Sequence, residues 1–173
     1  TNRGLMYKIK GDYDKAINDF DWAIETDPKY IKAYFQRSEL RKRKSNYDGA
    51  INDLDNASRL EPQNGGIYIA RAELQIYIRK LEKAISDFKK ATELGPEILR
   101  KDNHHIDPLI NNIEFLIKEK LGEFPESSYF LAFIYEKRDE KGKAIEFYKK
   151  YIQISKREDW KKRAIQRLKE LES

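Results

Sequence analysis

The chain has 173 residues and a formal net charge of +5, a length that suits one domain or two small ones. Charged residues of both signs make up 38% of it and are interleaved, which is typical of solvated helix faces rather than of a nucleic-acid groove. The chain has no cysteine, so disulfides, thiol nucleophiles and cysteine zinc sites are excluded. It begins "TNRG", without Met and inside a repeating pattern, so we expect a fragment of a longer protein.

The first 98 residues repeat one pattern with a period of 34 residues. The segment "DYDKAINDFDWAIETDP" returns as "NYDGAINDLDNASRLEP" and as "KLEKAISDFKKATELGP", each preceded by a second helical stretch. Small and closing residues recur at equal positions: Ala16, Ala50, Ala84 and Pro28, Pro62, Pro96. A fixed period in this range indicates stacked helical repeats, here over about 1–30, 31–64 and 65–98.

The next segment, 99–124, breaks the period. Asp107 and Pro108 are typical of a helix start and Gly122 of a helix end, which predicts a helix over about 107–121. Its apolar stripe is Leu109, Ile113, Leu116 and Ile117. The segment is either a compressed, degenerate repeat or a lone inserted helix, and we favour the compressed pair.

A fourth copy follows over 125–158. Ala132, Tyr135, Ala144 and Tyr148 fall at the offsets of the earlier copies, whereas Tyr151 and Lys156 replace the second alanine and the proline. The last stretch, 159–172, places Trp160, Ala164, Leu168 and Leu171 on one helical face and charged residues on the other. This pattern predicts a capping helix at the end of a stack.

The pattern resembles the tetratricopeptide repeat family, in which each repeat is a pair of antiparallel helices, A and B. Small residues at Gly4, Ser38 and Ala72 in A and at Ala16, Ala50 and Ala84 in B match those of the family, as do Phe20, Leu54 and Phe88 beside them. Close helix packing needs this combination of small and bulky residues. The resemblance implies one all-α domain over 1–173, a right-handed superhelix, or solenoid, of antiparallel helix pairs with a C-terminal capping helix.

Catalysis has little support in the sequence, so we expect no enzyme, no cofactor and no metal site. His104 and His105 are the only histidines, and adjacent side chains point in different directions, which makes them a poor metal pair. The series Asp19, Asp53 and Asp87 is interpreted as a solvated outer face, because neighbouring repeats hold such carboxylates too far apart for one ion.

The resemblance implies a binding surface on the concave side, which the A helices line. The residues expected there combine apolar anchors with polar groups that could fix a peptide backbone: Asn2, Leu5, Lys32, Phe35, Gln36, Glu39, Arg43, Ile69, Ala70, Glu73, Tyr77, Tyr129 and Phe133.

Some tetratricopeptide domains hold the C-terminal carboxylate of heat-shock chaperones in a clamp of Lys, Asn and Arg. If a first repeat is missing upstream, Asn2 and Lys32 match two clamp positions, but Gln36 stands where the clamp has Arg. Because Gln cannot make the charged, bidentate contact with a carboxylate, this form of binding is disfavoured.

The sequence therefore predicts a non-catalytic scaffold that holds a peptide or helix of a protein partner in the concave groove, as a monomer or with weak self-association. No apolar run reaches the roughly 20 residues of a membrane span, and the compartment stays open, with the cytoplasm slightly favoured. One alternative is a regulatory or targeting domain cut from a larger enzyme. Another is weak nucleic-acid binding through "RKRK" at 41–44, although RNA-reading repeats place base-contacting residues at fixed positions and these vary.

Overall fold

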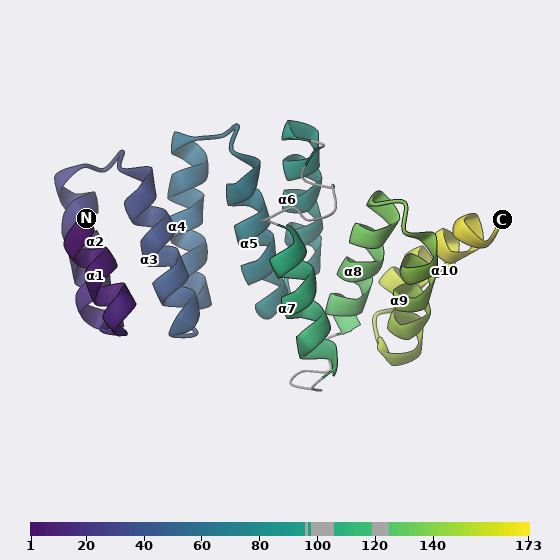
Figure 1. The fold of residues 1–173 in the computed structure, drawn as a ribbon. Helices are drawn as coiled ribbons and strands as arrows, with labels where there is room; N and C mark the ends of the chain where they lie inside the picture. Colours follow the sequence, from purple (N-terminus) through teal and green to yellow (C-terminus); the bar gives the residue numbers. More distant parts are fainter. Residues whose placement is uncertain (96, 98–105, 119–124) are drawn as a thin grey trace.

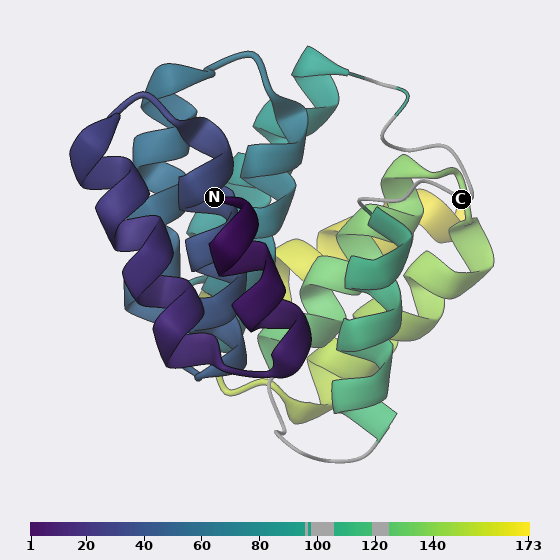
Figure 2. The ribbon, with the colours of Figure 1, turned by 60° about the vertical axis from the view of Figure 1, so that its left-hand side comes forward.

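The computed structural model describes residues 1–95, 97, 106–118 and 125–173, and this part of the chain contains ten helices and no strand (Figure 1). Three helix pairs come first: α1 (Asn2–Lys10) with α2 (Tyr13–Thr26), α3 (Ile31–Arg43) with α4 (Tyr47–Leu60), and α5 (Gly65–Tyr77) with α6 (Leu81–Leu94). They are followed by α7 (Ile106–Lys118), the pair α8 (Pro125–Lys137) and α9 (Lys141–Ile154), and α10 (Glu158–Glu172). The fold is the all-α, right-handed superhelix of antiparallel pairs that the repeat predicts (Figures 1 and 2).

Each pair is closed by the same tight turn. Gly11 adopts a left-handed φ of 81°, and Ser45, Arg79 and Asp139 do so at the equivalent positions with φ of 58–60°. In every copy the next amide donates back to a carbonyl five residues earlier, as Asp12 does to Tyr7 at 2.9 Å. This hydrogen bond is that of a Schellman motif, and it turns the B helix antiparallel to the A helix. Three of the four turns therefore hold a side chain in a conformation that favours glycine.

The small residues of the repeat lie where the helices approach most closely. Ala16, Ala50, Ala84 and Ala144 are all 0% exposed. A Cβ on Gly4 would lie 3.1 Å from Cζ of Phe20 and 3.2 Å from Cβ of Asp19, which is too close for a larger side chain. These contacts confirm the register that the sequence predicts.

A ladder of ion pairs runs through the first three helix pairs. Arg3, Arg37 and Arg71, which lie 34 residues apart on the A helices, bind Asp19, Asp53 and Asp87 on their own B helices at 2.5–2.6 Å. Arg37 also binds Asp21 at 2.5 Å and Arg71 binds Asp55 at 2.7 Å, so each of these two joins its own B helix to the preceding one. We call these pairs the arginine ladder.

The arginine ladder corrects the interpretation of the aspartate series as an outer face. Asp19, Asp53 and Asp87 are 6%, 1% and 7% exposed. The hydrogen bonds from Arg3 lower the pKa of Asp19, whereas the deeper burial of Asp53 raises its pKa despite the contacts with Arg37 and Arg41. Asp53 and Asp87 neutralise the largely buried Arg37 and Arg71, whereas Arg3, the partner of Asp19, has 69% of its side chain exposed.

The C-terminal half has a continuous apolar and aromatic core that joins α5 to α10. Phe88 of α6 packs edge-on against Phe130 and Phe133 of α8, with ring centroids 5.8 Å apart in both cases. Tyr129 packs edge-on against Tyr148, Tyr151 and Trp160 at 4.7–5.4 Å.

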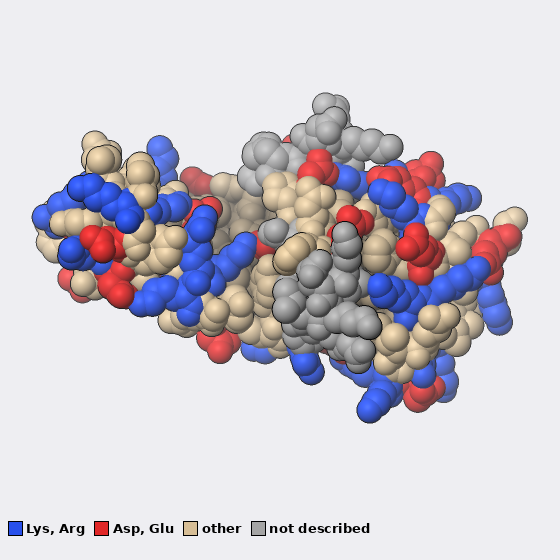
Figure 3. Space-filling model, turned by 60° about the horizontal axis from the view of Figure 1, so that its bottom comes forward, with Lys and Arg blue, Asp and Glu red and all other residues tan. Residues whose placement is uncertain are grey.

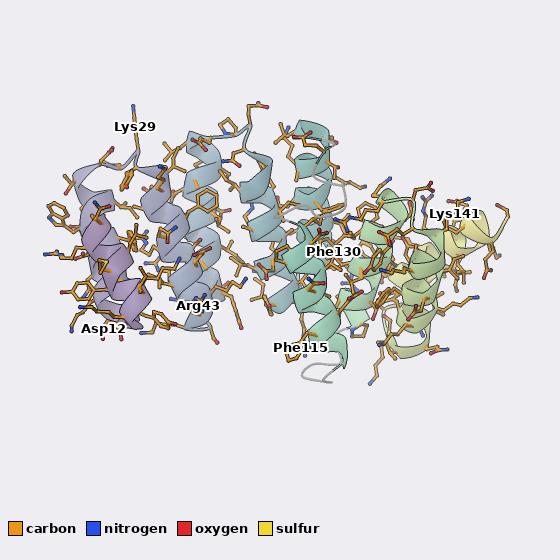
Figure 4. The ribbon with its side chains drawn as sticks, in the orientation of Figure 1. Asp12, Lys29, Arg43, Phe115, Phe130 and Lys141 are labelled. Carbon is orange, nitrogen blue, oxygen red and sulfur yellow. The ribbon has the colours of Figure 1, made fainter. Side chains whose placement is uncertain are left out.

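The irregular segment contains one described helix, α7, which begins at Ile106 and packs against α8. Leu109 and Ile113 are buried, as the apolar stripe predicts, and Phe115 is 56% exposed near the lower end of α7 (Figure 4). The predicted helix start at Asp107 is one residue later than the observed start of α7 at Ile106. The second helix of a compressed repeat, the two histidines, Gly122 and the side chains of Leu116 and Ile117 lie outside the described residues.

The last helix covers the fourth pair. Trp160 and Ala164 of α10 are 4% and 0% exposed, and Leu171 is packed against the same core. Arg167 of α10 binds Glu136 of α8, and Lys149 of α9 binds Glu172 at 2.8 Å. The apolar stripe of the sequence therefore faces the stack, as expected of a capping helix.

Candidate functional site: a groove between the first A helices

Two adjoining cavities lie along α1 and α3. One, of about 340 Å³, is lined by Leu5, Phe35 and Gln36 among others, and the second, of about 500 Å³, shares Leu5 and Gln36 with it. We call the two together the N-terminal groove. Its complete lining is Thr1, Leu5, Lys8, Ile9, Tyr13, Phe20, Tyr30, Lys32, Phe35, Gln36, Glu39 and Arg43.

The floor of the groove is apolar at its centre. Leu5 is 39% exposed and Ile9 78% exposed, although both are large apolar residues on α1. Phe35 is half-buried and packs against the core of the second pair. A ligand side chain placed between α1 and α3 would therefore remove apolar surface from water on both sides.

Two ion pairs, 34 residues apart, join successive A helices across the groove side. Lys8 of α1 binds Glu39 of α3, and Lys42 of α3 binds Glu73 of α5 at 2.6 Å. The Lys8 ammonium also donates to the Gln36 side-chain oxygen at 2.8 Å. These contacts hold the spacing of the A helices and leave Lys32 and Arg43 exposed on the lining.

Tyr77 extends the same side onto α5. Its ring stacks on that of Tyr47 with centroids 5.2 Å apart and an interplanar angle of 5°. Burial, with Glu73 adding to it, raises the pKa of Tyr77 to about 12. Asn2 is exposed at the start of α1, and Ala70 is half-buried on α5.

Two residues expected in the groove belong to the core instead. Ile69 is 3% exposed and shares the C-terminal core cluster with Ile106 and Ile113 of α7. Tyr129 is 6% exposed because three aromatic rings surround it. Phe133 is half-buried and lines a different cavity, described below, so the structure does not bring it together with Leu5 and Phe35.

Lys8, Ile9 and Tyr13 line the groove although they were not expected there. Ile9 occupies the same repeat position as Arg43 and Tyr77, two residues that the sequence does place in the groove. That shared position was the signal for Ile9. Lys8 shares its position with Lys42, and its role became visible only through its partner on the next A helix.

The basic run at 41–44 is largely engaged by acids. Arg41 binds Asp53 at 3.0 Å, Lys42 binds Glu73, and Lys44 binds Asp14. Arg43 is exposed at the lower end of α3 (Figure 4). Figure 3 shows Lys and Arg beside Asp and Glu over both halves of the face that the lower helix ends form.

A larger cavity, of about 840 Å³, lies in the C-terminal half between α6, α8 and α10. We call it the C-terminal pocket. Its lining is Glu82, Ile85, Ser86, Lys89, Tyr129, Phe133, Glu136, Lys137, Tyr148, Trp160, Lys162, Arg163, Gln166 and Arg167.

Among the described residues there is no cluster of three or more His, Cys, Asp or Glu side chains with metal-binding geometry. No described helix is both long enough and apolar enough to cross a membrane.

The repeated pairs are matched by two tetratricopeptide repeat profiles, one over residues 1–30 and the other over 66–97 and 125–158. These matches cover more than half of the chain, and the chain belongs to the tetratricopeptide repeat family. The pair α3–α4 has the same architecture, including its turn at Ser45 and its ladder arginine Arg37. A comparison with curated protein sequences finds no match.

Solved structures with a similar fold include a MamA protein, with a TM-score of 0.53, 21% identity and coverage of 87% of this chain and 68% of the other. The first tetratricopeptide domain of Spaghetti (RPAP3), solved with the HSP90 peptide SRMEEVD, has a TM-score of 0.55 and 22% identity, covering 70% and 90%. YrrB, described as a tetratricopeptide protein with an unusual peptide-binding site, has a TM-score of 0.51 and 17% identity, covering 97% and 89%. At these identities the likeness shows the fold.

Proposed function

We propose that the chain is a non-catalytic protein-interaction scaffold that holds a peptide or a helix of a protein partner in the N-terminal groove. The family and the similar structures, one of them bound to a peptide, support the scaffold role. The observation that carries the choice of surface is the pair of adjoining cavities that share exposed Leu5 and the Gln36 amide.

The groove favours an amphipathic ligand. An apolar side chain would lie between Leu5 and Phe35, while the polar edge formed by Lys32, Gln36 and Arg43 would contact backbone carbonyls or acidic groups. Since Lys8 and Glu39 neutralise each other, the centre of the groove has little net charge. Apolar contact should therefore contribute more to affinity than salt-dependent attraction.

Selection of a displayed random peptide library on the folded chain tests the proposal. Peptides so obtained should bind the parent and lose most of their affinity for Leu5→Asp, because that change puts a charge into the cavity. Trp22→Asp is the matched control, since Trp22 lies on α2 and is 59% exposed. Peptides that bind both variants equally would show that this groove is not the binding surface.

A further inference from the structure

The C-terminal pocket exists because α10 returns to α6, far from it in sequence. Arg157, which precedes α10, binds Glu82 of α6 at 2.7 Å, and the Trp160 indole N–H donates to the same carboxylate at 3.0 Å. The pocket shares no lining residue with the N-terminal groove, and its walls are α6, α8 and α10, with Tyr148 of α9 between them.

The floor of the pocket is aromatic. Trp160 packs edge-on against Tyr129, which fixes its indole against the fourth pair. Phe133 is half-buried, packs edge-on against Phe88 and lines the pocket. Rigid aromatic side chains of this kind supply apolar contact area at little cost in conformational entropy.

Both acids of the pocket already have partners. Glu82 accepts from Arg157 and Trp160, and Glu136 is bound by Arg167 and accepts from the Tyr148 hydroxyl at 2.9 Å. Their negative charge is therefore neutralised within the protein.

Four cations on the lining have no such partner. Lys89 and Lys137 lie 5.8 and 5.5 Å from the centroid of Phe133, and Arg163 lies 4.6 Å from that of Trp160. Lys162 is exposed beside Arg163. Within the part of the chain that the structure describes, no carboxylate lies within ion-pair distance of any of the four. The pocket therefore has an aromatic floor and an uncompensated positive rim.

We propose that the C-terminal pocket binds a peptide segment in which Asp or Glu residues flank one aromatic or large aliphatic side chain. The apolar side chain lies against Phe133, beside the edge of the largely buried Trp160, and the carboxylates pair with the cations on α6, α8 and α10. The cavity volume lies within the range of sites that enclose a single ligand group. Both features are needed, because an inorganic anion would engage the cations and leave the aromatic floor exposed.

The experiment uses the whole chain with Trp22→Phe, which leaves Trp160 as the single tryptophan. The probes are two labelled synthetic peptides of equal length with one central Phe, the first flanked by Glu and the second by Gln. The Glu peptide should shift Trp160 emission on titration and bind roughly tenfold more tightly than the Gln peptide at low salt, with the difference shrinking as salt is added.

The paired variant Lys162→Ala/Arg163→Ala should weaken the Glu peptide roughly tenfold in fluorescence anisotropy, a readout that does not depend on Trp160. Lys10→Ala/Lys29→Ala removes the same charge from exposed residues outside the pocket and should leave affinity unchanged. Circular dichroism of each variant verifies that the helices are intact. Equal binding of the two peptides, equal loss in both paired variants, or full competition by inorganic phosphate or by a single-stranded oligonucleotide would overturn the proposal.

Discussion

The contact between the A and B helices is made by an ion pair in the first three helix pairs and by apolar side chains at the same positions of the fourth. In the first three, an arginine of the A helix binds a buried aspartate of the B helix. At the corresponding positions of the fourth pair stand Leu131 and Phe147, which are 0% and 9% exposed. The contact is buried in both halves, so the helix-pair geometry does not require either solution.

The ion pairs and the apolar contact differ in what they require of the neighbouring residues. A buried arginine needs its acid, because an unpaired charge in a dry contact is costly, whereas Leu131 and Phe147 need only to fill the space. The arginine ladder also joins neighbouring pairs through Asp21 and Asp55, and the apolar contact extends instead into one core that joins α5 to α10. The N-terminal half thus combines two separate apolar clusters with discrete ion pairs between its helices, whereas the C-terminal half has one continuous core.

Asp53→Ala should have the largest effect, because Asp53 is 1% exposed and is bound by both Arg37 and Arg41. Removing it leaves two arginines without their main acid, and the loss of one partner of a buried pair costs about 3–5 kcal/mol. Urea unfolding of parent and variant, followed by circular dichroism, measures the change.

Asp19→Ala is the matched control at the same repeat position. Its partner Arg3 has 69% of its side chain exposed and can turn to water, so the loss should be about 1 kcal/mol or less. Equal losses at Asp19 and Asp53 would show that burial does not set the strength of the arginine ladder.

The two halves of the chain have the same residue, a buried alanine, at the close crossing of the A and B helices. Ala50→Leu and Ala144→Leu should each lower the free energy of unfolding by about 1–3 kcal/mol, because both sites are 0% exposed and overpacking displaces the neighbouring helix. Asn52→Leu, on the exposed face of α4, should leave it nearly unchanged. If Asn52→Leu destabilises as much as Ala50→Leu, the register of the B helices is wrong.

Replacing the ion pair of the third helix pair by the apolar residues of the fourth tests whether the two kinds of contact are interchangeable. Arg71→Leu/Asp87→Phe installs the residues of the fourth pair, and its stability should stay within about 1–2 kcal/mol of the parent, because hydrophobic replacement of a whole buried pair is often neutral. Asp55, the second partner of Arg71, has 43% of its side chain exposed and would remain solvated.

Asp87→Ala alone should cost more than the double change, since it leaves Arg71, whose side chain is 15% exposed, with the partly exposed Asp55 as its remaining acid. Thermal unfolding of the three chains gives the comparison. A double variant less stable than Asp87→Ala would mean that the third pair cannot adopt the apolar contact.

The part of the fold that could be predicted from the sequence is the part that the periodic residues define. Ala16 and its repeats defined the pairs and their register, and the stripe on α10 defined a helix that covers the stack. The arginine ladder was missed because the aspartates were considered alone, although Arg3, Arg37 and Arg71 share their period. In this chain the charges that recur on both helices of a repeat form ion pairs with each other.

The candidate sites were harder to predict because they depend on where the period breaks. Ile69 has the position of Phe35, yet its side chain is buried in a cluster that α7 joins, and α7 belongs to the irregular segment. The C-terminal pocket brings together residues of α6 and α10, whose contact no local pattern predicts. A single sequence defines the regular stack well, and positions the irregular contacts poorly.

The smallest expected effect is a pH dependence of the contact between α10 and α6. The pKa of Glu82 lies below its ordinary value of 4.5, because its own backbone N–H, Arg157 and Trp160 donate to the carboxylate. A carboxyl group whose folded pKa is lowered contributes stability above its unfolded pKa and loses that contribution as the pH falls through the folded value. The contact should therefore weaken below about pH 4.5, and only modestly, because the Glu82 side chain is 54% exposed.

Other acids titrate in the same range, Glu136 among them, so the measurement compares the melting temperatures of the parent and of Glu82→Gln between about pH 7 and pH 3. The parent should be slightly more stable at neutral pH and the difference should vanish in acid, whereas a difference that stays constant with pH would mean that the Glu82 charge does not hold α10 in place.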